Sequence, residues 1–437
     1  MRPIWLVQLP FPSSADPNQQ LSAYYKDYSK KFASAIPEYF IREDALWELP
    51  LWIAHLAGLL EAIGSDYQFL DLSGCEPEAD VCLSELLPRI EEGEIVMLSP
   101  LAQNLDIATG VSKRLLELGR LPVIGGNMAG LVNQEDAFIV YRGLIDVERI
   151  TALISCTGDG SVSGIEQSRR GRITWTPNYS RLAGYKVPLL RLNASHGCLY
   201  NCSFCGDAWS RKLYVVELSA LEAEVKQFEE LFPDTQLLYI GDKTFGQSRE
   251  GIANLCKVLA QHPRYRLIVQ SHINQIDGEL IDLMRKLRVV VVELGLETAD
   301  RDMLKQSAKD MPDEDVYLAK LKQIKAAGIN VVLNLLGGLP MEQPSSHDKT
   351  LTAMRRWSSV VWLYNLYNFV PYPLTPYFES LKDRIFTWNF SCWREDMPPV
   401  FHPYHQSADE SWSRFLEKIA VAHEVINSSP GARRQNT

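Results

Sequence analysis

The chain has 437 residues, of which 46% are hydrophobic and 22% are charged, and its formal net charge is −10. The length predicts two or three domains, and the composition is that of a globular protein with a substantial core. The acidic charge argues against nucleic-acid and anionic-membrane partners, and no stretch reaches the roughly 18 consecutive apolar residues that span a membrane. We therefore expect a soluble, cytoplasmic protein that binds neither nucleic acid nor membrane.

The first part of the chain, residues 1–150, alternates apolar strands with helices. Strands are predicted at 67–72, 94–100, 121–130 and 136–143, and helices at 47–64 and 106–119. Short loops between these elements predict a doubly wound, Rossmann-like α/β domain. The polar stretch at 151–186 carries Gly and Ser and is predicted to be a linker.

The second part, residues 187–377, repeats a strand–helix unit. Strands are predicted at 187–193, 235–243, 265–273, 288–297, 329–338 and 358–370, and helices at 219–232, 249–261, 277–287, 313–328 and 345–357. Six alternations predict a partial (β/α)6 barrel, whose active residues sit at the carboxyl ends of the strands. The remainder, residues 378–437, is predicted to be a small α-rich C-terminal cap with a tail.

A cysteine cluster stands just after the first barrel strand. Residues 196–205 read HGCLYNCSFC and place three of the chain's eight cysteines, Cys198, Cys202 and Cys205, within eight positions. Disulfides do not suit a reducing compartment. A structural zinc site needs four ligands, and no second cysteine pair is present, although His196 could supply the fourth. An iron–sulfur cluster, for which thiolates are the usual ligands, is the remaining choice.

The segment CLYNCSFC resembles the CxxxCxΦC signature of radical S-adenosylmethionine (radical SAM) enzymes, with Phe204 as the aromatic residue. The resemblance implies a [4Fe–4S] cluster on the three cysteines, with SAM chelating the fourth iron. It further implies reductive cleavage of SAM to a 5′-deoxyadenosyl radical, an electron donor such as flavodoxin or ferredoxin, and a small-molecule or peptide substrate.

The ends of the later barrel strands carry further pieces of the same resemblance. Gly241-Asp242 stands where the family has its Gly-Gly-Glu motif, and Glu297 lies in a stretch similar to GxES…L…K. Residues 334–342 and 369–377 resemble the family's GlPgE and pyPgTp turns. The resemblance assigns SAM contacts to Phe204, Gly241, Asp242, Glu297 and Asn334.

The N-terminal domain looks like the cobalamin-binding domain that precedes many radical SAM barrels. Its strand-end loops then predict cobalamin contacts at Ser99, Gly125, Gly126, Asn127, Tyr141 and Gly143. The DxHxxG motif, whose histidine ligates cobalt in other cobalamin proteins, is absent, as it often is in radical SAM relatives. Its absence leaves open a vestigial domain that binds nothing.

The predicted activity is cobalamin-dependent methylation of an unactivated carbon in a natural product or peptide. The alternative is a cobalamin-independent radical SAM epimerase, dehydratase or rearrangement enzyme, for which Cys392 could return a hydrogen atom. A non-catalytic iron–sulfur protein is a third hypothesis, which the strand-end motifs oppose. The C-terminal region resembles extensions that cap the barrel mouth, and its candidate substrate contacts are Trp393, His402, Tyr404 and His405.

Overall fold

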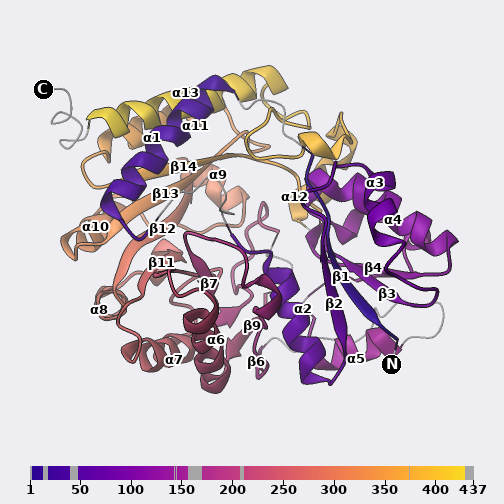
Figure 1. The fold of residues 1–437 in the computed structure, drawn as a ribbon. Coiled ribbons are helices and arrows are strands. Elements are labelled where there is room, and N and C mark those ends of the chain that lie inside the picture. Colours follow the sequence, from indigo (N-terminus) through magenta and orange to yellow (C-terminus); the bar gives the residue numbers. More distant parts are fainter. Residues whose placement is uncertain are drawn as a thin grey trace, which may run out of the picture.

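A computed structural model describes residues 2–12, 18–39, 48–141, 143, 145–155, 170–206, 211–373 and 375–428. Figure 1 shows two sheets with their helices, one from the first part of the chain and one from the second. Within these described ranges, no helix has the length and apolar character needed to cross a membrane. Residues 156–169 of the predicted linker and residues 429–437 of the predicted tail lie outside the described ranges.

The N-terminal sheet has five parallel strands in the order β2-β1-β3-β4-β5. They are β1 (Ile4–Gln8), β2 (Tyr67–Asp71), β3 (Ile95–Leu98), β4 (Leu121–Ile124) and β5 (Ile139–Val140), with helices α3 (Ala79–Leu86), α4 (Leu105–Glu117) and α5 (Val147–Ser155). The predicted doubly wound sheet is confirmed. The sequence pattern missed β1, which pairs with both β2 and β3 and so completes the sheet.

The second sheet has six parallel strands in the order β14-β13-β12-β11-β10-β7. They are β7 (Leu190–Leu192), β10 (Leu237–Ile240), β11 (Arg266–Ser271), β12 (Val289–Glu297), β13 (Asn330–Gly337) and β14 (Leu363–Asn368). The helices that follow are α6 (Leu218–Leu231), α7 (Arg249–Ala260), α8 (Gly278–Lys286), α9 (Arg301–Gln306), α10 (Glu314–Ala326) and α11 (Pro344–Arg356). The six predicted strands and five predicted helices are confirmed.

A small third sheet lies beside the start of the barrel. It joins β6 (Arg170–Ile173), β9 (Leu213–Val216) and β8 (Ser195–His196) in that order. One of its strands, β6, comes from the predicted linker. The other two flank the cysteine segment, so the sheet fixes both ends of that segment relative to β7.

Helices from both ends of the chain cover the edge strand β14. α1 (Gln19–Ala35) packs against α13 (Ala408–Ser428), as Figure 1 shows. The phenols of Tyr24 and Tyr25 donate to the carbonyls of Tyr364 and Leu366 on β14. The N-terminal part of the chain therefore contributes to the barrel as well as to its own sheet.

The segment between the barrel and α13 packs toward the N-terminal sheet. It contains α12 (Pro376–Leu381) and the 3₁₀ helices η6 (Lys382–Arg384) and η7 (Phe390–Cys392). Trp393 and Val400 belong to the hydrophobic core of the N-terminal sheet, together with Val7 and Leu98. This segment thus joins the two halves of the molecule.

Candidate active site

The cysteine loop, residues 197–206, lies at the carboxyl end of β7 and is anchored by the loops after other strands. The side chain of Gln247 donates to the first carbonyl of the loop at 3.0 Å. Ser203 donates its amide to the Ser307 carbonyl at 2.9 Å and accepts from the Tyr377 amide at 3.2 Å. The backbone of the loop is therefore positioned by the protein itself.

The three clustered cysteines are thiols rather than disulfides. Cys202 is 9% exposed, and burial raises the pKa of its thiol to about 11. Among the described residues, no three His, Cys, Asp or Glu side chains form a ready-made metal site, so the sulfurs would have to draw together around an inserted cluster. The donor set fits, because thiolates favour iron–sulfur clusters and a bound metal deprotonates its thiol ligands. The assignment of these ligands stays a prediction.

Asp242 binds the start of the cysteine segment. Its carboxylate accepts from the amides of Ala194 and Ser195 at 2.7 and 3.0 Å, and from the Ser195 hydroxyl at 2.6 Å. Burial raises the pKa of this carboxyl to about 6, although the hydrogen bonds act to lower it. At Gly241, an added Cβ would lie 2.0 Å from Asn193 Oδ1, so any other residue would displace the Asn193 side chain. The contacts make Asp242 a positioning residue, and its predicted contact with SAM stays a prediction.

Two of the predicted SAM residues meet through a lysine that the sequence analysis did not single out. Glu297 ends β12 with a φ of +62°, a left-handed conformation that non-glycine residues rarely adopt. Its carboxylate forms a buried ion pair with Lys309 at 2.7 Å. The Lys309 ammonium also lies 5.8 Å from the centre of the Phe204 ring. Strained backbone of this kind is concentrated at functional sites.

Several buried polar atoms on the barrel strands have no hydrogen-bond partner. They are Asn193 Oδ1, His272 Nε2, Asn334 Oδ1 and Asn368 Oδ1, which lie on or directly after β7, β11, β13 and β14. His272 stacks on Tyr200 of the cysteine loop with 4.2 Å between ring centres. Burial lowers the pKa of His272 to about 3, and its Nδ1 accepts a backbone amide, so Nε2 carries the proton. Such atoms fit SAM, whose carboxylate, ammonium and ribose hydroxyls both donate and accept.

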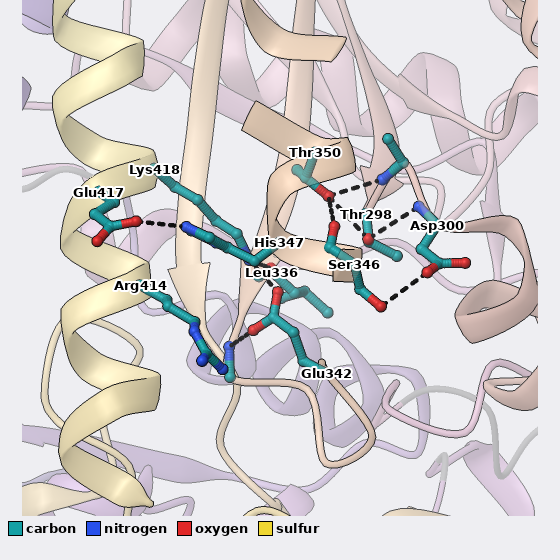
Figure 2. A network of polar contacts seen from close by, with 12 residues as sticks. Thr298, Asp300, Leu336, Glu342, Ser346, His347, Thr350, Arg414, Glu417 and Lys418 are labelled. Atoms are coloured by element: carbon teal, nitrogen blue, oxygen red, sulfur yellow. Dashed lines mark hydrogen bonds and ion pairs between the residues drawn. The ribbon is translucent and has the colours of Figure 1, made fainter. Parts of the chain in front are cut away.

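The turn after β13 is held by a buried ion pair, which Figure 2 shows. Glu342 accepts from the Gly338 amide at 3.0 Å and pairs with Lys418 of α13, and both charged side chains are completely buried. Lys418 also donates to the Leu336 carbonyl at 3.1 Å. The C-terminal helix therefore fixes the turn that resembles GlPgE.

Figure 2 also shows hydrogen bonds that join the end of β12 to α11. Asp300 accepts from the Ser346 hydroxyl at 2.8 Å and from Lys349 at 3.0 Å. The hydroxyls of Thr298 and Thr350 lie 3.0 Å apart. Neutral and charged hydrogen bonds thus hold the segment between Glu297 and its partner lysine.

The predicted cobalamin contacts lie at the carboxyl edge of the N-terminal sheet. They follow β3, β4 and β5 and are Ser99, Gly125, Gly126, Asn127, Tyr141 and Gly143. Gly126 has a φ of +89°, and an added Cβ would lie 2.9 Å from Ser99 Oγ. An added Cβ at Gly125 would meet nothing within 4 Å, whereas one at Gly206 would lie 3.9 Å from Asn127 Nδ2. This edge therefore has open space at Gly125 and approaches the end of the cysteine loop at Asn127.

Two apolar side chains at the same edge were missed by sequence reasoning. In the strand order 2-1-3-4-5, the chain changes direction across the sheet between β1 and β3, where ligands of doubly wound sheets bind. Phe11, after β1, is 44% exposed, and Leu101, after β3, is 56% exposed. Exposed apolar side chains beside an open glycine fit a large flat ligand such as a corrin. The signal from Phe11 was hidden because β1 was not predicted, whereas Leu101 directly follows the predicted strand at 94–100 and was not singled out.

The C-terminal candidates are dispersed. Trp393 is fully buried, and its indole donates to the Thr387 carbonyl, a position that favours packing over substrate contact. Cys392 is partly buried in η7, which packs against the 3₁₀ helix η1 (Ala102–Asn104) of the N-terminal sheet. The remaining candidates, His402, Tyr404 and His405, are exposed. The structure does not bring these residues together, and their roles stay predictions.

The sequence and the fold were compared with those of known proteins. Residues 192–353 match the model of the radical SAM superfamily. The anaerobic magnesium-protoporphyrin IX monomethyl ester cyclase of Cereibacter sphaeroides is 21% identical over 430 residues, covering 86% of this chain and 68% of the cyclase. The hopanoid C-3 methylase of Methylococcus capsulatus is 21% identical over 379 residues, covering 78% of this chain and 70% of the methylase.

Solved structures agree on the fold. The radical SAM methyltransferase TsrM from Kitasatospora setae, solved with cobalamin and a [4Fe–4S] cluster, superposes with a TM-score of 0.61 at 16% identity, covering 86% of this chain and 76% of TsrM. The cobalamin-dependent SAM radical enzyme OxsB gives a TM-score of 0.60 at 11% identity, covering 84% of this chain and 53% of OxsB. Residues 192–353 therefore form a radical SAM domain, and the described chain has the fold of the cobalamin-dependent radical SAM proteins TsrM and OxsB.

Proposed function

We propose that the chain is a cobalamin-dependent radical SAM C-methyltransferase, acting on an unactivated carbon of a small molecule or peptide. A flavodoxin- or ferredoxin-type protein would supply the electron. When bound, the cluster and SAM supply a 5′-deoxyadenosyl radical that removes a substrate hydrogen atom, and cobalamin supplies the methyl group. Clustered thiols suit a reducing compartment, so the proposed location is the cytoplasm, and the net charge of −10 argues against a nucleic-acid substrate.

The chain's own residues provide binding and orientation. Cys198, Cys202 and Cys205 would hold the cluster, while Asp242 fixes the backbone that leads into their loop. The unpaired atoms of His272 and the strand-end asparagines would orient SAM. The buried ion pairs at Glu297 and Glu342 would fix the conformation of the turns around SAM, and their charged groups are shielded from solvent.

One observation carries the methyltransferase proposal over its alternatives. The carboxyl edge of the N-terminal sheet approaches the cysteine loop at Asn127 and Gly206. A methyl donor on that edge would therefore face the part of the molecule where the substrate radical forms. The same edge offers open space at Gly125 and exposed apolar side chains at Phe11 and Leu101.

The test is cobalt uptake by a pair of glycine variants. Gly125→Leu places a side chain where nothing lies within 4 Å, so the sheet should fold normally but the space for cobalamin should be filled. Gly74→Leu is the matched control, because Gly74 is also open but lies in a turn after β2. After reconstitution with hydroxocobalamin, we expect cobalt in the wild type and in Gly74→Leu, and little in Gly125→Leu. Equal cobalt in both variants would place the ligand elsewhere.

The alternative reaction classes keep a defined test. Among the relatives is a cyclase, so this fold does not by itself specify methyl transfer. If the wild-type protein takes up no cobalt yet cleaves SAM, the sheet is a vestige, and epimerisation, dehydration or rearrangement becomes the leading proposal. Cys392→Ala is then the informative variant, because an epimerase needs a thiol to return a hydrogen atom to the substrate radical, so the variant should form no epimerised product.

A further inference from the structure

A cavity of about 350 Å³ lies between the barrel strands and α1. Its walls include the residues Tyr25, Tyr28, Phe32, Tyr39, Arg191, Tyr239, Ile268, Glu293, Asn365 and Tyr367. Tyr25, Tyr28 and Phe32 recur at helical spacing on α1 and Tyr39 follows that helix, while the others come from β7, β10, β11, β12 and β14. The cavity is therefore the interior of the barrel, closed on its open side by one face of α1.

The barrel face that borders this cavity is polar, which is unusual for a buried parallel sheet. Neighbouring positions on β12, such as Val292 and Leu294, are fully buried and apolar, while Glu293 between them faces the cavity. On β14, the side chains of Asn365 and Tyr367 also face the cavity. Inward polar side chains in a sheet with an apolar outer face indicate a binding cavity rather than a packed core.

Glu293 is the acidic group of the cavity wall. Its carboxylate accepts from the phenol of Tyr239 at 3.1 Å, and Asn334 also bonds to it. Burial raises the pKa of this carboxyl, and the same carboxyl contributes to raising the pKa of the phenols of Tyr28 and Tyr367. The hydrogen-bond partners of Glu293 are therefore the neutral side chains of Tyr239 and Asn334, and Arg191 acts on the carboxyl only as a nearby charge that lowers its pKa.

The cation of the wall, Arg191, is already engaged. Its guanidinium pairs with Glu48 through two nitrogens and lies 4.5 Å from the centre of the Tyr239 ring. A bidentate pair of this kind is the strong form of an Arg–carboxylate contact. Arg191 therefore offers little to an anionic ligand, and an anion would meet the carboxylate of Glu293.

Aromatic rings make up much of the remaining wall. Five tyrosines and one phenylalanine border the cavity: Tyr25, Tyr28, Tyr39, Tyr239, Tyr367 and Phe32. Ring faces attract cations, and aromatic walls beside a carboxylate are the usual environment of bound ammonium groups. The walls therefore favour an apolar body that bears a positive charge.

We propose that this cavity binds the substrate and that the substrate carries a basic nitrogen on an apolar or aromatic body. The basic nitrogen pairs with the carboxylate of Glu293, and the tyrosine rings enclose the apolar body. The inference rests on the proposed function for the chemistry that follows binding. Glu293 lies four residues before Glu297 on β12, roughly 13 Å from the strand end where SAM is expected. A substrate anchored at Glu293 would reach from the depth of the barrel toward the radical.

The experiment compares two ligands that differ in charge but share a phenyl ring, phenethylamine and phenylpropionate. Dissociation constants are measured by ligand-detected NMR on the full-length, cluster-containing protein with SAM present. We expect the amine to bind at least tenfold more tightly than the acid. Glu293→Gln, which keeps the bond from Tyr239, should weaken the amine roughly tenfold to a hundredfold and leave the acid unchanged or improved.

Controls separate the proposed site from general effects. Glu222→Gln on the exposed face of α6 removes a carboxylate of the same kind and should leave amine binding unchanged. Tyr367→Leu should weaken benzyltrimethylammonium, a permanent cation without N–H donors, about twofold to thirtyfold. Equal affinity for amine and acid, or an unchanged amine affinity in Glu293→Gln, would overturn the inference. Loss of amine binding when SAM is added would also overturn it, because the cavity would then belong to SAM.

Binding is read without turnover, so this test is independent of the proposed reaction. A protein that binds the amine through Glu293 but takes up no cobalt would keep the cavity assignment and lose the methyltransferase proposal. A protein that takes up cobalt and cleaves SAM but does not bind the amine would keep the methyltransferase proposal and lose the cavity assignment.

Discussion

The two parallel sheets end in loops of opposite character. The barrel strands end in buried charges, with Glu297 paired to Lys309 and Glu342 paired to Lys418. The N-terminal sheet ends in glycine, serine and exposed apolar side chains, with open space at Gly125. Turns that orient a small, charged ligand need fixed partners, whereas an edge that receives a large flat ligand must keep side chains out of the way.

The largest expected effect is the loss of the iron–sulfur cluster at one edge without loss of cobalt binding at the other. Replacing Cys198, Cys202 and Cys205 with alanine should abolish iron and sulfide binding and SAM cleavage, because no thiolate remains in the loop. Cobalt uptake by the N-terminal sheet should persist. Iron, sulfide and cobalt per chain are measured together after anaerobic reconstitution. A full cluster in the triple variant would refute the ligand assignment.

The next effect tests the buried pair behind the turn after β13. Lys418→Met strands the fully buried carboxylate of Glu342 and should cost roughly 3–5 kcal/mol of unfolding free energy in urea. Adding Glu342→Gln should recover most of the loss, since glutamine still accepts from the Gly338 amide. Lys226→Met at an exposed pair should cost less than about 1 kcal/mol. Equal losses at Lys418 and Lys226 would show that the pair does not hold the turn.

Asp242 distinguishes positioning from direct SAM contact. Asp242→Ala leaves the Ala194 and Ser195 amides without an acceptor and should weaken SAM binding by roughly 1–3 kcal/mol, whereas Lys243→Ala at an exposed neighbour should not. Asp242→Asn still accepts from both amides, so a positioning role predicts near-wild-type SAM affinity. A loss in the asparagine variant as large as in alanine would instead show a charge contact with the SAM ammonium.

The smallest effect is the pH dependence of the same carboxyl. Its folded-state pKa is raised to about 6, above the ordinary value of 3.8, so the native state binds more protons between these values. Stability should therefore rise as pH falls from 7 to 5, by roughly 1 kcal/mol relative to Asp242→Asn. Urea unfolding of both proteins across this range measures the difference. Parallel pH profiles would mean that the carboxyl is not buried as described.

Sequence reasoning found the barrel because each of its strands is a short apolar run followed by an amphipathic helix. It missed β1, whose five residues are followed by two prolines and precede no regular pattern. It also missed α1, where tyrosines interrupt the apolar face because they border the cavity rather than a packed core.

Among site residues, the cysteine loop and the strand ends followed from local motifs. The partners Lys309 and Lys418 did not, because their contacts depend on tertiary packing. One signal for Lys418 was available: it stands at helical spacing between Phe415 and Ala422, on the apolar face of α13. A lysine on such a face is expected to pair with a buried carboxylate, because burying an unpaired charge is costly.

Both edges are expected to carry cofactors in one molecule. The most direct measurement is the metal content of wild-type protein reconstituted anaerobically with iron, sulfide and hydroxocobalamin. We expect roughly four iron atoms and roughly one cobalt atom per chain, with the iron lost in the cysteine variant and the cobalt lost in Gly125→Leu. Iron without cobalt in the wild type would contradict it.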